Sequence, residues 1–99
     1  MIRNVAIIGA GNMGSGIAQK SAQENFNVQM VDREKEWVDK GHQTIGKFLD
    51  EAIERRIFRP EQAEDIKSRI TGVVGHENVS RDTDLVIEAV YEDFALKQQ

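Results

Sequence analysis

The sequence predicts an α/β fold built on a doubly wound parallel sheet, and three features of the chain predict it. Val5–Ile8 and Leu85–Ile87 are uninterrupted apolar runs, as in strands that are buried on both faces of a parallel sheet. Helical patterns alternate with strand patterns along the chain. Glycines stand directly between the first strand and the first helix. We therefore expect the strand order 3-2-1-4, with a pair of helices between the second and third strands.

The first part of the chain predicts two strands separated by one helix. The first strand is Val5–Ile8, and the helix covers Met13–Glu24, with Asn25 suited to a left-handed stop. The second strand covers Phe26–Val31, where apolar and polar residues alternate, and Asp32 ends it. The helix face expected to pack against the sheet is Met13, Ile17, Ala18, Ser21 and Ala22.

Two helices and two strands are expected next. Apolar residues recur at threes and fours from Glu34 to about Ile57, which indicates a long amphipathic helix. Pro60 suits the first turn of a second helix, which runs to about Arg69. Strands follow over Ile70–Val74 and Asp84–Val90, and another helix begins at Glu92. The expected apolar positions of the two helices are Trp37, Val38, Gly41, Ile45, Phe48, Leu49, Ala52, Ala63 and Ile66.

Composition narrows the class of protein. A chain of 99 residues suits one domain, and 39% hydrophobic residues suffice for a packed core. The net charge is -4 and no basic stripe is present, so nucleic acid is not an expected partner. No apolar run approaches the ~18 residues that a membrane span needs. The chain has no cysteine, which excludes disulfides and thiolate chemistry, and the cytoplasm is the expected compartment.

The glycines form the pattern G-x-G-x-x-G in the setting of a Rossmann-like dinucleotide site, between an apolar strand and a helix. Gly9 would allow a tight turn, Gly11 would let a pyrophosphate approach the backbone, and Gly14 would let helix and strand pack closely. Amides at the helix start would face the phosphates. The alternative is a tight turn without a ligand. The residues expected to contact the cofactor here are Gly9, Ala10, Gly11, Asn12, Met13 and Gly14.

Asp32 gives a second indication of a dinucleotide. A carboxylate at the end of the second strand accepts hydrogen bonds from the hydroxyls of the adenosine ribose. The alternative is an ordinary turn-forming aspartate. The charge of Asp32 favours NAD over NADP, although Arg33 beside it could pair with a 2′-phosphate.

Other chemistries find no support in the sequence. No Gly-Lys-Ser/Thr follows the glycines, so the pattern is not a P-loop. His42 and His76 have no metal-ligand company and are expected on the surface. Ser15 and Ser21 have no visible general base.

Four segments together resemble one enzyme family. These are VAIIGAGNMGSGIAQ, VQMVDRE, RITG and DLVIEAVYEDFALKQQ, and they resemble the N-terminal domain of the L-3-hydroxyacyl-CoA dehydrogenases over essentially all 99 residues. The resemblance implies an NAD-dependent oxidation of the 3-hydroxyl of an acyl-CoA to a ketone. It places Glu92 and Lys97 near the nicotinamide half of NAD, and Arg55 at a position that contacts CoA. The alternatives are a helix N-terminal acid for Glu92 and a solvated side chain for Lys97. Phe48 departs from the family, which has a serine there.

The resemblance also implies what the chain lacks. The family's catalytic histidine, its partner glutamate and the helical domain lie downstream, so residues 1–99 are expected to be a C-terminally truncated NAD-binding domain with no catalytic residues. The full-length protein is expected to use an acyl-CoA and to form a homo-oligomer. An unprotected fourth strand is expected to make the fragment self-associate. Two other hypotheses about the function remain: a dehydrogenase of a non-CoA hydroxy acid, and a non-catalytic NAD-sensing module.

Overall fold

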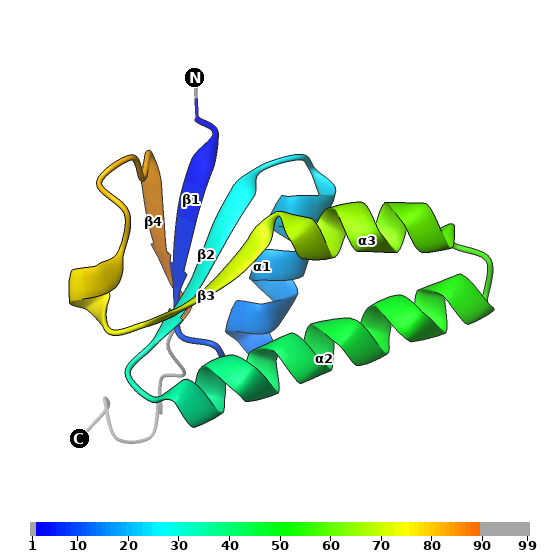
Figure 1. Cartoon of the computed structure of the whole chain (residues 1–99), viewed down its shortest axis with the longest axis horizontal. Coiled ribbons are helices and arrows are strands. Elements are labelled where there is room, and N and C mark those ends of the chain that lie inside the picture. The colour runs from blue at the N-terminus through cyan, green and yellow to red at the C-terminus, as the bar shows by residue number, and fades with distance from the viewer. Residues whose placement is uncertain (1, 90–99) are drawn as a thin grey trace, which may run out of the picture.

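The computed structural model describes residues 2–89 and has the predicted α/β architecture (Figure 1). Four parallel strands form one sheet in the predicted order, β3-β2-β1-β4. The strands are β1 (Asn4–Ile8), β2 (Asn27–Asp32), β3 (Ile70–Val74) and β4 (Leu85–Glu88). The helices are α1 (Asn12–Gln23), α2 (Lys35–Glu54), α3 (Pro60–Ser68) and the short 3-10 helix η1 (His76–Asn78).

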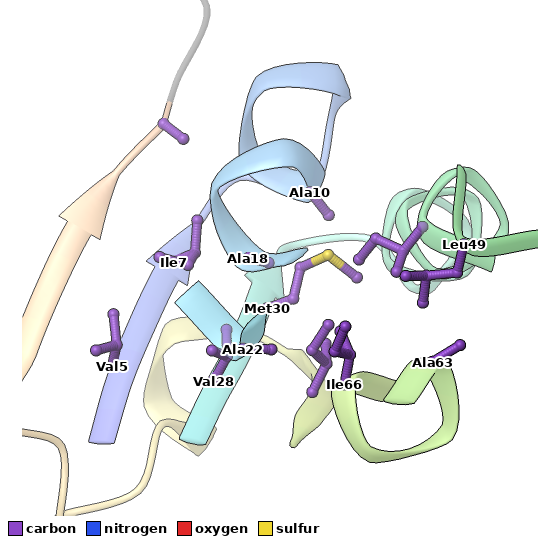
Figure 2. Packing of buried hydrophobic residues seen from close by; sticks show 13 residues of the cluster. Val5, Ile7, Ala10, Ala18, Ala22, Val28, Met30, Leu49, Ala63 and Ile66 are labelled. Atoms are coloured by element: carbon purple, nitrogen blue, oxygen red, sulfur yellow. The ribbon is translucent and has the colours of Figure 1, made fainter. Parts of the chain in front are cut away.

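The three α-helices share one face of the sheet. They contact one another as well as the strands, and α2 and α3 extend from the sheet as a hairpin (Figure 1). Between the helices and the strands lies the hydrophobic core, in which Ile7, Met30 and Leu49 are fully buried (Figure 2). Ala18 and Ala22 are also fully buried, so their small side chains let α1 lie close to the sheet. Because α2 and α3 lie between β2 and β3 in the chain, the predicted helical pair is confirmed.

The opposite face is crossed by the chain between β3 and β4. Gln29 of β2 holds this segment, because its side chain accepts a hydrogen bond from the Ser80 amide and donates one to Thr83, both at 2.8 Å. Ala6 and Val31 are nonetheless fully buried.

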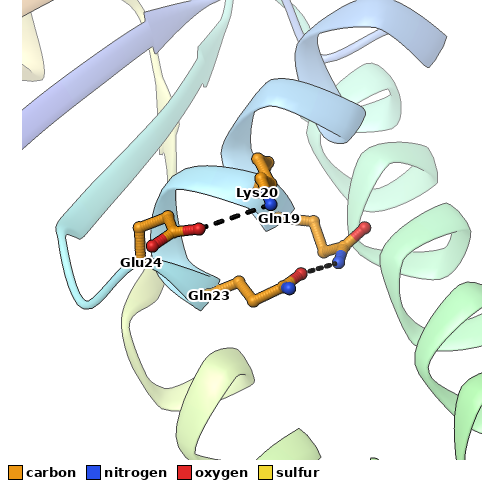
Figure 3. A network of polar contacts seen from close by, with 4 residues as sticks. All are labelled: Gln19, Lys20, Gln23 and Glu24. Atoms are coloured by element: carbon orange, nitrogen blue, oxygen red, sulfur yellow. Dashed lines mark hydrogen bonds and ion pairs between the residues drawn. The ribbon is translucent and has the colours of Figure 1, made fainter. Parts of the chain in front are cut away.

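Helix α1 ends where the sequence predicts. Asn25 adopts a φ of 73°, the left-handed conformation that asparagine tolerates better than most residues. Two contacts one helical turn apart support the last turns (Figure 3). Gln19 donates to Gln23 at 3.0 Å, and Lys20 pairs with Glu24 at 3.3 Å. Each such pair on an exposed helix contributes about 0.2–0.5 kcal/mol.

The predicted packing faces need three corrections. Trp37 and Phe48 of α2 are 47% and 51% exposed, and Met13 of α1 is 60% exposed. The buried stripe of α2 is narrower than predicted. Trp37 and Phe48 each stand one position before a buried residue, and one position turns a side chain about 100° around the helix. Met13 lies in the first turn of α1, where Gly14 rather than Met13 meets the sheet. The buried residues of α2 are Val38, Gly41, Ile45, Leu49 and Ala52.

Strand β4 is also less buried than its apolar run predicts. Leu85 and Val86 are 40% and 55% exposed, because β4 is an edge of the described sheet and pairs only with β1 there. Asp84, predicted as part of this strand, lies just before it. Its carboxylate accepts hydrogen bonds from the amides of Arg3 and Asn4 at 3.0 and 2.9 Å, and so joins the start of β1 to that of β4.

Candidate dinucleotide-binding site

The turn between β1 and α1 depends on glycine at two positions. Gly9 has a φ of 104°, a conformation that side chains rarely adopt. A β-carbon on Gly14 would lie only 1.6 Å from the Gly9 carbonyl oxygen, so α1 approaches the strand end as closely as the backbone permits. Gly11 differs from both, since a β-carbon there would have no heavy atom within 4 Å. The absent side chain of Gly11 therefore leaves open space rather than a packing contact.

The start of α1 presents backbone amides at this turn. The first hydrogen bond of the helix runs from the Ser15 amide to the Gly11 carbonyl at 2.8 Å. The amides of residues 12–14 precede it and have no carbonyl within the helix to bond. Among the described residues no side chain caps the helix at Gly11. These amides and the helix dipole suit an anion.

Asp32 links the end of β2 to the glycine turn. One carboxylate oxygen accepts a hydrogen bond from the Ala10 amide at 3.0 Å, and the other accepts one from the Arg33 amide at 2.7 Å. Each carboxylate oxygen can accept a further hydrogen bond. Asp32 is half-buried, so the carboxylate both fixes the turn and stays accessible to a ligand hydroxyl.

An open cleft of about 740 Å³ joins these elements at the carboxyl ends of the strands. A cleft there, between the first and fourth strands of an open α/β sheet, is where such folds bind ligands. The sequence predicted four residues of its lining as site residues, and those it missed include Trp37, His76 and Glu88. Glu88 could have been found, because it ends the strand next to β1. The lining residues are Ile8, Gly9, Gly11, Met13, Asp32, Arg33, Trp37, His76, Glu88 and Ala89.

The other predicted site residues are distributed differently. Ala10 is buried and reaches the cleft region only through its backbone. Arg55 directly follows α2, about 20 Å along the helix from Gly41 at 1.5 Å per residue, and it does not line the cleft. Asn12 opens α1. Glu92 and Lys97 lie outside the described residues.

A dinucleotide fits this arrangement. The start of α1 offers a diphosphate amides that have no carbonyl partner within the helix. Gly11 leaves open space for the close approach of the diphosphate, and Asp32 offers a carboxylate for sugar hydroxyls. Over residues 2–89, no group of His, Asp or Glu side chains is placed to hold a metal ion, and no helix is long and apolar enough to cross a membrane. His42 and His76 are exposed, as predicted.

Comparison with known proteins identifies the family. Residues 4–99 match the family described as 3-hydroxyacyl-CoA dehydrogenase, NAD binding domain. The chain is 38% identical to a probable 3-hydroxyacyl-CoA dehydrogenase of Caenorhabditis elegans, covering 99% of the chain and 33% of that relative. It is 36% identical to a glyoxysomal fatty acid beta-oxidation multifunctional protein of Brassica napus, covering 99% of the chain and 13% of that protein.

Solved structures agree with these relatives. The (S)-3-hydroxybutyryl-CoA dehydrogenase of Ralstonia eutropha is 39% identical with a TM-score of 0.88, over 98% of the chain and 34% of that structure. A diketoreductase is 29% identical with a TM-score of 0.80, over 98% of the chain and 35% of that structure. The chain thus spans about a third of the length of the relatives named 3-hydroxyacyl-CoA or 3-hydroxybutyryl-CoA dehydrogenase. It belongs to the 3-hydroxyacyl-CoA dehydrogenase family, in which it corresponds to the domain that binds NAD.

Proposed function

We propose that this chain is the NAD-holding part of an enzyme that oxidises L-3-hydroxyacyl-CoA to 3-ketoacyl-CoA. The observation that carries the proposal is the cleft in which the glycine turn, the start of α1 and Asp32 meet. The family match over residues 4–99 supports the substrate class. The chain is expected to bind NAD.

In this proposal each element of the cleft has one task. The amides of residues 12–14 bind the diphosphate, and Gly11 leaves room for it. Asp32 accepts hydrogen bonds from the adenosine ribose while it holds the Ala10 amide at 3.0 Å. Met13 and Ala89 contribute apolar walls to the cleft. NAD held by these residues would supply the acceptor for the hydride that leaves the substrate carbon.

The remaining site residues are proposed on the resemblance. Glu92 and Lys97 are assigned to the nicotinamide half, after the carboxyl end of β4. Arg55 is assigned to a phosphate of CoA, since a guanidinium binds phosphate well. Its exposure at the end of α2 is compatible with such a contact. The exposed Phe48 on the same helix supplies no hydroxyl, which distinguishes this surface from the family pattern.

Two measurements test the proposal. Calorimetry of the folded chain is expected to show NAD binding, and the absence of heat with both NAD and NADP would refute it. The protein that contains this chain together with its catalytic domain is expected to oxidise NADH in the presence of acetoacetyl-CoA, measured by absorbance. A protein that binds NAD but leaves acetoacetyl-CoA unreduced would refute the substrate class alone.

A second candidate is an oxidoreductase for a substrate without CoA. The diketoreductase noted above acts on dicarbonyl compounds and shares the fold with a TM-score of 0.80, which supports this alternative. Phe48 supports it as well, because it replaces a polar CoA contact. Reduction of a simple diketone but not of acetoacetyl-CoA would favour this candidate.

We also propose a cytoplasmic location and a homo-oligomeric parent protein. The absence of cysteine supports a reducing compartment. Relatives named glyoxysomal and peroxisomal show that the compartment varies within the family. Fractionation of the source cells would decide the location.

A further inference from the structure

Helix α2 contacts the glycine turn at a position that has no side chain. A β-carbon on Gly41 would lie 2.8 Å from the Ala10 carbonyl oxygen, 2.8 Å from Met30 Cε and 2.9 Å from Met30 Sδ. Gly41 is buried, and Figure 2 shows Met30 pointing from β2 toward α2, on the side where Ala10 also lies. Any side chain at residue 41 would therefore have to displace the turn or the core.

Displacement of the Ala10 carbonyl oxygen would also displace part of the proposed cofactor site. The Ala10 carbonyl belongs to the same planar peptide group as the Gly11 amide, so the two move together. Gly11 lines the cleft, and the Ala10 amide is held by Asp32 at 3.0 Å. A shift of this peptide would thus alter both the diphosphate side and the ribose side of the cleft.

We propose that Gly41 is a positioning residue for NAD. Because Gly41 has no side chain, α2 can pack directly against the Ala10 carbonyl and so fix the position of the Ala10–Gly11 peptide beside the cleft. The inference rests on the proposed role of the glycine turn in holding the diphosphate. It assigns to α2, which contributes Trp37 to the cleft, a second role in cofactor binding.

Three alanine variants separate this role from ordinary packing. G41A is expected to raise the Kd for NAD on the order of tenfold, because a shift of a few tenths of an ångström misplaces the amides. G46A lies on the same helix with no heavy atom within 4 Å of the new β-carbon, so the Kd is expected to stay unchanged. G72A would bring a β-carbon within 2.6 Å of Val38 of α2, away from the turn. It is expected to lower the melting temperature while the Kd stays within about twofold.

The affinities are measured by calorimetry on the full chain, at a temperature at which circular dichroism shows every variant folded. A Kd of G41A within about twofold of the wild-type value would overturn the inference, as would an equal loss in G72A. If the wild-type chain binds no NAD, the proposed function fails first and this inference fails with it. Binding by the wild-type chain with no effect of G41A defeats the inference alone.

The double variant G41A/M30V distinguishes the turn from the core. Valine at residue 30 removes Sδ and Cε, which leaves the Ala10 oxygen as the close neighbour of the new β-carbon. Compared with M30V, the double variant is expected to bind NAD on the order of tenfold more weakly. Recovery of the M30V affinity would show that the effect passes through the core, and would overturn the inference. This pair also provides the test if G41A alone fails to fold.

Discussion

Gly11 and Gly14 are two residues of one sequence pattern with different physical roles. A β-carbon on Gly14 would overlap the Gly9 carbonyl, whereas one on Gly11 would project into open space beside the cleft. We expect Gly14→Ala to lower stability by about 1–3 kcal/mol or more, because overpacking against a backbone atom cannot relax easily. Gly11→Ala is expected to keep the wild-type melting temperature and to lose NAD affinity. Thermal unfolding and calorimetry measure the two effects.

A matched control for this pair lies one turn further along α1. A β-carbon on Gly16 would also meet no heavy atom within 4 Å, and Gly16 does not line the cleft. Gly16→Ala is therefore expected to lower neither the melting temperature nor the affinity for NAD. Wild-type NAD affinity in Gly11→Ala would contradict the assignment of that residue to the diphosphate.

Asp32 combines a structural contact with a ligand contact, and the two can be separated. Asp32→Ala frees the Ala10 amide, which loosens the turn for either cofactor. The contact with the 2′-hydroxyl of the adenosine ribose is lost only for NAD, because that hydroxyl is esterified in NADP. We therefore expect NAD binding to weaken on the order of tenfold to a hundredfold, the value of hydrogen bonds to a charged group, and NADP binding to weaken much less. Equal losses in parallel titrations would refute the ribose role.

Residue types alone predicted the glycine turn and the stop at Asn25, because both depend on local backbone conformation. Trp37, His76 and Glu88 were missed as cleft residues, since each enters the cleft from a different segment. A pattern along one segment does not state which side chains of another segment point toward it. The hydrogen bonds from Gln29 of β2 to Ser80 and Thr83 were not predicted for the same reason.

At the scale of elements, hydrophobic periodicity located the three α-helices and the four strands of the described residues, with ends that differ by a few residues, but it did not predict the 3-10 helix η1. Periodicity failed for residues at the border between the buried and exposed faces of a helix. Spacings of three and four admit residues that flank the buried stripe, and so Trp37 and Phe48 were assigned to the core of α2. The strand start at Asp84 was misjudged because its carboxylate binds backbone amides just before β4.

Asp84 makes the junction of β1 and β4 sensitive to pH. Hydrogen bonds from the Arg3 amide, and then from the Asn4 amide, lower the pKa of this carboxyl below its ordinary value of 3.8. A pKa that is lower in the folded state stabilises the fold above the unfolded pKa, and this stabilisation disappears as the pH falls through the folded pKa. Asp84→Ala is expected to lower the melting temperature at neutral pH, with a difference that shrinks below pH 3.8.

A conservative variant isolates the charge at this junction. Both amides bind the same oxygen of Asp84, so the amide oxygen of Asp84→Asn can accept both bonds without titrating. Asp84→Asn is expected to lie between wild type and Asp84→Ala at neutral pH. A wild-type advantage that persists unchanged to the lowest pH would contradict the expected linkage.

At the scale of the whole molecule, the strand order was predictable because the connection rules and the glycine turn leave few arrangements of a parallel sheet. The burial of β4 was not predictable, because an apolar run shows that a strand can be covered but not what covers it. The three helices lie on the face that includes the core of Figure 2, and Gln29 secures the crossing segment on the other.

The exposed strand leads to a prediction about association. β4 is an edge of the described sheet with Leu85 and Val86 both exposed, and apolar edge strands pair with other chains. We expect the chain to form dimers or larger species as its concentration rises, measured by light scattering after size exclusion. Val86→Lys is expected to shift it toward monomer, since a charged residue blocks edge pairing. Val74→Lys, at an exposed position on the opposite edge strand β3, is the matched control and is expected to have little effect. A clean monomer at high concentration, or dissociation by Val74→Lys instead, would show that β4 is not the associating surface.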